Sequence, residues 1–411
     1  MPGVLPEGEP VPADGRLPES AREGIGRRSF GIYVHVPFCA TRCGYCDFNT
    51  YTAAELDGQA EGPPVSLENY ASLAIAEIAF ARRVLGPVDI PVSTVFFGGG
   101  TPTLLPPAAL GAILRAIGAE FGLAPGAEVT SEANPESVDA GILGELRDQG
   151  VTRMSFGMQS ASPAVLAVLD RVHSPGRPAR CAAWARAAGF EHVSLDLIYG
   201  TPGESAADWR RSLEAAIGAG PDHVSAYALT VEAGTRLAAR VRRGELTAPD
   251  DDVLAERYLA ADEALAAAGF GWYEISNWAA GGRARCAHNL AYWTGGDWWG
   301  IGPGAHSHIG GTRWWNVRHP HRYGAKIGAG VSPGQAREVL SGAERRLERV
   351  MLLIRLAEGC PVEALGPAGR ANAPAVVGDG LADPAAYARG RVVLTRPGRL
   401  LADTVARALT E

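Results

Sequence analysis

The sequence predicts an α/β fold built on a partial six-stranded (β/α)6 barrel, followed by a small C-terminal α+β domain. Between residues 30 and 230, short β-rich runs alternate with amphipathic helical stretches, an order typical of parallel βαβ units. Many of these stretches end in glycine, which readily takes the left-handed conformation that follows a last helical turn. Because only six strands are expected, we predict an open barrel rather than a closed eight-stranded one.

The expected strands and helices follow one another in strict alternation. The strands are Gly31–Val36, Thr94–Phe97, Glu128–Glu132, Arg153–Phe156, Val193–Ile198 and Val224–Ala228. The helices between them are Leu67–Val84, Ala108–Glu120, Ala140–Asp148, Pro178–Ala188 and Ala206–Ile217. In such folds the functional residues lie at the C-terminal ends of the strands.

Composition divides the chain into four segments. Residues 1–28 are rich in proline, glycine and acidic residues without apolar periodicity, which predicts a disordered leader. Residues 29–235 hold the barrel. Residues 236–335 contain most of the tryptophans and histidines, which predicts a special site or a layer that covers the barrel mouth. Residues 336–411 form the small domain, and its expected elements are Ala343–Leu356, Val392–Leu394 and Leu400–Leu409.

Charge and cysteine usage limit the function classes. The net charge of −7 argues against a nucleic-acid partner. The leader lacks the apolar run of a secretory signal and is too acidic for a mitochondrial presequence. No run of about 18 apolar residues predicts a transmembrane helix, so we expect a cytoplasmic protein, with peripheral contact to a membrane as the alternative. Six cysteines, three of them within eight residues, indicate a reducing compartment and a metal site.

The three close cysteines lie in the run Cys39-Ala-Thr-Arg-Cys43-Gly-Tyr-Cys46, directly after the first strand. Thiolates hold Fe–S clusters, and three of them leave one iron of a [4Fe–4S] cubane without a protein ligand. The alternatives are three unconnected thiols or a zinc site, but zinc would need a fourth ligand at regular spacing. The spacing resembles that of the radical S-adenosylmethionine (SAM) superfamily. There the open iron chelates SAM, and an electron cleaves the C–S bond of SAM.

Polar residues and glycines at the next strand ends predict a ligand site. The run Gly98-Gly-Gly-Thr-Pro102 closes the second strand, where glycine lets the backbone approach a ligand closely, although a plain tight turn would look the same. Glu132, Gln159 and Asp196 lie at or near the ends of the following three strands. A carboxylate enclosed there needs a partner. Each residue alone could be structural, but three in succession indicate one shared site.

Four motifs make the chain similar to the oxygen-independent coproporphyrinogen dehydrogenases and their relatives, the HemW-type haem chaperones. They are Tyr-Val-His-Val-Pro-Phe-Cys, Gly-Gly-Gly-Thr-Pro-Thr, Ser-Phe-Gly-Met-Gln-Ser and Asp-Leu-Ile-Tyr-Gly. The resemblance runs from about Ser29 to the C-terminus and implies a radical SAM barrel with a winged-helix-like C-terminal domain. The SAM contacts it implies are Tyr33, Gly99, Gly100, Thr101, Glu132, Gln159, Arg171 and Asp196. Arg171 would pair with the SAM carboxylate, unless it is only an exposed helix arginine.

Two features favour the chaperone branch of this family. The dehydrogenases carry a further cysteine two residues past the third, whereas Phe48 stands there in this chain. The chaperones show His-Asn-x-x-Tyr-Trp, which His288-Asn-Leu-Ala-Tyr-Trp293 matches. The resemblance therefore implies a chaperone that passes haem to apo-haemoproteins, membrane-bound respiratory enzymes among them. The alternatives are a coproporphyrinogen III dehydrogenase and a radical SAM methyltransferase or haem-degrading relative.

A haem site needs an apolar slot, an axial ligand and cations for the propionates, and residues 270–323 supply aromatic, histidine and arginine side chains. His288 is the first candidate for the axial ligand, because histidine is a common donor to haem iron. The next candidates are Cys286, His306 and His308. Plain core packing of the tryptophans and a structural role for His288 are the alternatives. The loop Gly300–His308 is expected at the active-site mouth, or as a plain turn.

Overall fold

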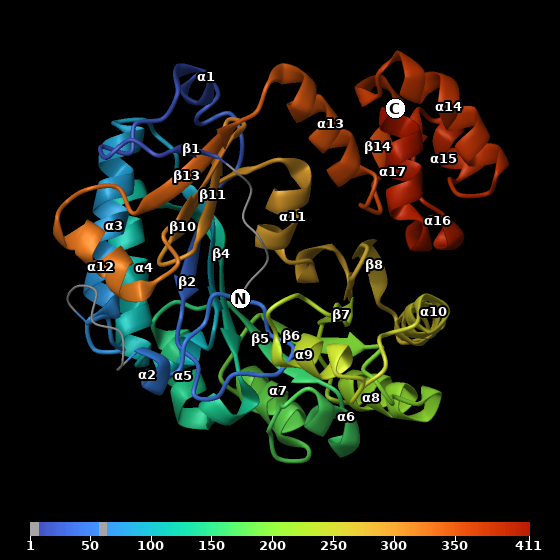
Figure 1. Ribbon diagram of the computed structural model, residues 1–411, viewed down its shortest axis with the longest axis horizontal. Helices are drawn as coiled ribbons and strands as arrows, with labels where there is room; N and C mark the ends of the chain where they lie inside the picture. The colour runs from blue at the N-terminus through green and yellow to red at the C-terminus, as the bar shows by residue number, and fades with distance from the viewer. Residues whose placement is uncertain (1–7, 57–63) are drawn as a thin grey trace.

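The computed structural model describes residues 8–56 and 64–411 (Figure 1). At its centre lie the six expected parallel strands, each paired with the next in chain order. They are β2 (Phe30–Val36), β3 (Val92–Gly99), β4 (Leu123–Ala133), β5 (Arg153–Gln159), β6 (His192–Tyr199) and β7 (His223–Ala228). The α/β prediction is confirmed, and the sheet curls around a cavity at the C-terminal ends of these strands.

Helices between the strands cover the outer face of this curled sheet (Figure 1). They are α3 (Tyr70–Leu85), α4 (Pro107–Phe121), α5 (Ala140–Asp148), α6 (Pro163–Val168), α7 (Arg177–Ala187) and α8 (Ala206–Gly218), and the short α2 (Ala53–Leu56) follows β2. Residues alternate along each strand, so Ile32 and Val34 pack into the helical layer, where both are fully buried, while Tyr33 faces the cavity. Alternate residues of each strand therefore pack into the core, and the residues between them face the cavity.

The segment after the barrel adds strands to both edges of the sheet. Its elements are α9 (Arg236–Arg242), α10 (Asp251–Ala267), β8 (Gly271–Glu274), β9 (Asn277–Ala279), α11 (Ala287–Thr294), β10 (Asp297–Ile301), β11 (His306–Ile309), β12 (Thr312–Asn316), α12 (Pro320–Gly328) and β13 (Gly334–Val339). Strand β9 pairs antiparallel with β7, and β10 pairs parallel with β2. The aromatic residues therefore extend the sheet instead of forming a separate cover. Trp299 and Trp314 illustrate this, since both are buried in the main core with ring centroids 4.8 Å apart.

The prediction of a disordered leader over residues 1–28 is wrong for residues 8–28, and residues 1–7 lie outside the described part. Strand β1 (Glu9–Pro10) pairs antiparallel with β13, and α1 (Glu19–Arg22) follows. The segment is ordered because Leu17 and Ala21 are buried in the main core. The overall composition of residues 1–28 does not reveal these two contacts. The complete sheet has the order β1-β13-β12-β11-β10-β2-β3-β4-β5-β6-β7-β9-β8.

The C-terminal residues form a second, smaller core beside the barrel (Figure 1). Their elements are α13 (Gly342–Leu353), β14 (Cys360–Pro361), α14 (Pro367–Gly378), α15 (Pro384–Ala388), β15 (Arg391–Val392), α16 (Arg396–Leu400) and α17 (Ala402–Thr410). Arg399 ties this unit to the barrel side, because both terminal nitrogens of its guanidinium donate to Asp262 at 2.8 Å. Its winged-helix-like character stays a prediction. Among the described helices, none combines the length and apolarity needed to cross a bilayer.

Candidate functional site

One cavity of about 630 Å³ opens inside the barrel. All twelve site residues that the sequence singled out line it. They are Tyr33, Cys39, Cys43, Cys46, Gly99, Gly100, Thr101, Glu132, Gln159, Arg171, Asp196 and His288. Residues of strands β2 to β6, of the loops that follow them and of α11 thus meet at one place, as expected for the C-terminal edge of a parallel barrel.

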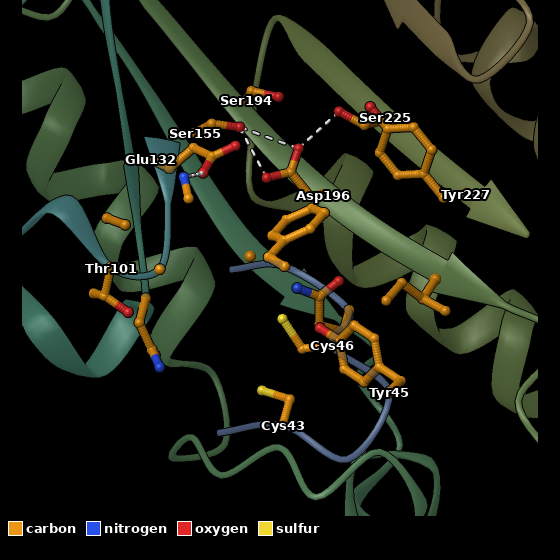
Figure 2. Close-up of a pocket in the computed structure, with 18 of the residues that line it drawn as sticks. Cys43, Tyr45, Cys46, Thr101, Glu132, Ser155, Ser194, Asp196, Ser225 and Tyr227 are labelled. Atoms are coloured by element: carbon orange, nitrogen blue, oxygen red, sulfur yellow. Dashed lines mark hydrogen bonds between the residues drawn. The ribbon is translucent and has the colours of Figure 1, made fainter. Parts of the chain in front are cut away.

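The three cysteines line this cavity as free, half-buried thiols, and Figure 2 shows two of them, Cys43 and Cys46. The loop is held on both sides, since the Cys39 N–H donates to Tyr51 O at 3.0 Å and the Gly44 N–H to Leu169 O at 3.0 Å. No three donor side chains in the described part are grouped to share one metal ion. A cubane has a different requirement, because each thiolate binds a different iron. Three thiols around one open space fit that requirement.

Glycine at position 100 lets the end of β3 touch the cysteine loop. A Cβ there would lie 2.4 Å from Phe38 O and 3.1 Å from Cys39 Sγ, so any side chain would push the two segments apart. The Gly100 N–H donates to Val36 O at 2.8 Å, and the Thr101 N–H donates to Phe38 O at 2.8 Å. The glycine run is therefore part of the site and is more than a plain turn.

Two carboxylates face the cavity from neighbouring parts of the sheet (Figure 2). Glu132 at the end of β4 accepts the Gly99 N–H at 3.2 Å, and Asp196 on β6 accepts the hydroxyls of Ser155 at 2.9 Å and Ser225 at 2.7 Å. Burial and the Asp196 carboxylate raise the pKa of Glu132 to about 8, and burial also raises the pKa of Asp196. Enclosed carboxylates favour a ligand with an ammonium group and hydroxyl groups, which SAM has.

Arg171 is anchored between β5 and the cysteine loop and is not an exposed helix residue. Its Nη2 donates to Gly157 O at 2.8 Å, and its Nη1 lies 3.6 Å from Cys43 Sγ. Gln159, two residues after Gly157, has a φ of 64°, a backbone conformation that few residues other than glycine adopt. Such conformations gather at functional sites, where surrounding contacts maintain them. The guanidinium stands where it can bind a carboxylate beside the cluster.

His288 lies beneath the cavity with both ring nitrogens engaged. Its Nδ1 and the Thr94 hydroxyl are 2.8 Å apart, and its Nε2 and the Tyr292 hydroxyl are 2.8 Å apart. The ring is buried and stacks on Phe96 at 5.2 Å, and this burial lowers its pKa to about 3. A bond from His288 to haem iron would have to displace the hydroxyl of Thr94 or Tyr292. The ligand role of His288 therefore stays a prediction.

The hydroxyl residues that hold Asp196 were missed from the sequence. Ser155 lies on β5 and Ser225 lies on β7. Thr130 and Ser194 also line the cavity from β4 and β6. The sequence could have indicated them, because alternate residues of a strand point to the same side, and these small polar residues lie at the positions that face the cavity.

The protein matches the family model described as the radical SAM superfamily over residues 33–216. It is 55% identical over 381 residues to "Heme chaperone HemW" of Mycobacterium tuberculosis (strain ATCC 25618 / H37Rv), which covers 92% of this chain and 94% of the relative. The chain belongs to the HemW family of radical SAM proteins. The HemW of Escherichia coli (strain K12) is 36% identical, over 68% of this chain and 70% of the relative.

The HemW-family chain also shares the fold of one solved structure, described as "Coproporphyrinogen III oxidase (HemN) from Escherichia coli is a Radical SAM enzyme". The TM-score is 0.79 at 19% identity, and the match covers 97% of this chain and 94% of that one. Membership of the radical SAM superfamily implies a [4Fe–4S] cluster and SAM. Phe48 follows the cysteine loop, and its side chain is 55% exposed among the residues that line the cavity.

Proposed function

We propose that this protein is a haem chaperone, which binds haem and passes it to apo-haemoproteins. One observation carries the proposal, namely the 55% identity to a HemW haem chaperone over nearly the full length of both chains. The site is consistent with it, since Phe48 stands where a fourth thiol of the cysteine loop would be expected in a dehydrogenase.

Residues that line the cavity would hold the cluster and SAM. Cys39, Cys43 and Cys46 would hold the [4Fe–4S] cluster, and when reduced it supplies the electron that cleaves SAM. Glu132 and the end of β3 would accept N–H hydrogen bonds from the SAM amino group, while Arg171 would bind the SAM carboxylate. Asp196 would accept hydrogen bonds from the ribose, with Ser155 and Ser225 fixing its orientation. The remaining contacts would come from Tyr33, Gly99, Gly100, Thr101 and Gln159.

The proposal also covers the haem acceptors and the cellular location of the protein. The acceptors would include membrane-bound respiratory enzymes, reached from the cytoplasm by peripheral contact with the membrane.

The competing function is oxidative decarboxylation of coproporphyrinogen III, and the similarity to HemN supports only a common fold. A parallel measurement separates the two functions. Anaerobically reconstituted protein with reductant and SAM is tested for coproporphyrinogen III turnover and for transfer of bound haem to an apo-haemoprotein. We expect about one haem bound per chain, transfer of that haem and no protoporphyrinogen. Steady formation of protoporphyrinogen, or failure to bind haem, would overturn the chaperone proposal.

A further inference from the structure

The histidine of the run Tyr33-Val-His35 lies between the cavity wall and the segment that follows the cysteine loop. His35 is 6% exposed near the end of β2, and it does not line the cavity. Both of its ring nitrogens form hydrogen bonds. Nε2 lies 2.9 Å from Asn49 O, and Nδ1 lies 3.0 Å from the Tyr33 hydroxyl. His35 therefore connects a residue that faces the cavity with the residue three positions after Cys46.

The partners of His35 fix the direction of both hydrogen bonds. A backbone carbonyl can only accept, so Nε2 carries the proton and donates to Asn49 O. Burial lowers the pKa of His35 to about 4, so near pH 7 the ring is neutral and has only one N–H. Nδ1 is therefore the acceptor, and the Tyr33 hydroxyl donates to it. With its proton directed at His35, the Tyr33 oxygen is available to other groups only as an acceptor.

The carbonyl of Asn49 is itself held in place. The Asn49 side chain donates through Nδ2 to Arg318 O at 2.8 Å and to Pro303 O at 3.0 Å. Gly304 leaves room for this contact, because a Cβ there would lie 2.6 Å from Asn49 Nδ2, and its φ of 74° suits glycine. The glycine-rich loop of residues 300–308 thus supports the segment after the cysteine loop and contributes no residue to the cavity lining.

Tyr33 lies next to the glycines that end β3. A Cβ on Gly98 would lie 3.1 Å from Tyr33 Cε2 and 3.1 Å from Glu132 Oε2, so the phenol ring and the carboxylate approach the same backbone position. A Cβ on Gly99 would lie 2.7 Å from His35 Cε1, so the histidine occupies space that only glycine leaves free. An amino group that binds the open iron through its lone pair keeps two N–H groups, which matches the two acceptors here, Tyr33 and Glu132.

We propose that His35 is a positioning residue for SAM. By accepting the Tyr33 proton, it presents the Tyr33 oxygen as an acceptor for an N–H of the SAM amino group, beside Glu132. Through Asn49 it also joins this contact to the segment that follows the cysteine loop, so the amino group and the cluster are positioned by one set of hydrogen bonds. This inference rests on the proposed SAM contacts of Tyr33 and Glu132 and does not depend on haem.

The test compares SAM binding by the reconstituted full-length protein and its variants at equal cluster content. SAM is titrated against the electron paramagnetic resonance signal of the reduced cluster, which gives the dissociation constant. His35→Gln keeps a donor near the position of Nε2 but lacks the acceptor at Nδ1. SAM should therefore bind about 2- to 10-fold more weakly, the usual range for one hydrogen bond. His35→Asn keeps an acceptor near the position of Nδ1 and should retain more SAM affinity than His35→Gln.

His192→Gln is the matched control. His192 also lies on a strand and forms a hydrogen bond through its Nδ1, which is 2.9 Å from Asp222 Oδ2. It stands at the start of β6, away from the C-terminal strand ends, and does not line the cavity. This variant should lose some stability and keep the SAM affinity of the wild type.

A double-mutant cycle shows whether His35 acts through Tyr33. Tyr33→Phe removes the hydroxyl and should itself weaken SAM binding about 2- to 10-fold. In the Tyr33→Phe background, His35→Gln should have no further effect on SAM affinity. A purely structural role of His35 would instead weaken SAM binding by the same factor in both backgrounds.

Three results would overturn the positioning role of His35. They are additive losses in the cycle, wild-type SAM affinity in His35→Gln, and a loss in His35→Asn as large as that in His35→Gln. If the His35 variants hold no cluster, Tyr33→Phe still decides, because unchanged SAM affinity in that variant refutes the proposed contact. If the wild-type cluster shows no response to SAM, the proposed SAM site itself fails and this inference fails with it, while haem transfer tests the chaperone function separately.

Discussion

The Nη1 of Arg171 lies 3.6 Å from the Sγ of Cys43. This contact joins the SAM-binding side of the cavity to the cysteine loop. Because the guanidinium is anchored on Gly157 O, Arg171→Ala should remove the SAM carboxylate partner without removing a cluster ligand. We expect reconstituted Arg171→Ala to keep its iron, while the change that SAM induces in the electron paramagnetic resonance spectrum of the reduced cluster weakens. Loss of iron from this variant would contradict the prediction.

The cysteine loop gives a second prediction. Cys39→Ala, Cys43→Ala and Cys46→Ala should each abolish a stable [4Fe–4S] cluster, because a cubane with two protein ligands has two irons open to solvent. The measurement is iron and sulfide content with visible absorption after anaerobic reconstitution. Cys181→Ala and Cys360→Ala serve as controls, since these thiols are buried in α7 and in the C-terminal core. A variant of one of the three that retains four irons would show that our ligand set is wrong.

The carboxyl of Glu132 predicts a pH dependence. Its pKa of about 8 in the folded protein lies above its ordinary value of 4.5, so without ligand the protonated form is favoured by folding. That contribution to stability is complete below pH 4.5 and is lost as the pH rises through 8. The N–H groups of the SAM amino group would donate to Glu132 and so favour the carboxylate. The rise in melting temperature on adding SAM should therefore be larger at pH 8 than at pH 6, and Glu132→Gln should flatten this difference. Equal rises at both pH values for the wild type would argue against a hydrogen bond from the SAM amino group to Glu132.

The buried ring of His288 gives a prediction about stability. His288→Ala removes a buried ring with two hydrogen bonds, which should cost about 2–4 kcal/mol of unfolding free energy. Tyr292→Phe, which removes only the hydroxyl partner, should cost about 1 kcal/mol. Denaturant unfolding measures both. If His288 is also the haem ligand, the Soret band should shift in His288→Ala and stay in place in Tyr292→Phe. An unchanged Soret band in both variants would leave His288 a purely structural role.

Much of the barrel and its site follows from sequence, because strand ends in a parallel barrel converge by geometry alone. Glu132, Gln159 and Asp196 could be placed together without a structure, since each follows a recognisable β-rich run. Sequence failed where the outcome depends on distant pairing. No local pattern tells that β10 joins β2, or that Leu17 packs into the main core. Motif matching also drew attention to His288 for haem, whereas tertiary contacts with Thr94 and Tyr292 decide the availability of its nitrogens.

Strand β2 pairs in parallel with β10, which is synthesised much later, so the site for iron is completed late in synthesis. Phe30 pairs with Asp297, so the strand that leads into the cysteine loop lacks its outer neighbour until most of the chain has left the ribosome. At about 5–20 residues per second, β2 waits roughly tens of seconds for that neighbour. The order of synthesis therefore delays maturation, and iron delivery to Cys39, Cys43 and Cys46 belongs after translation rather than during it.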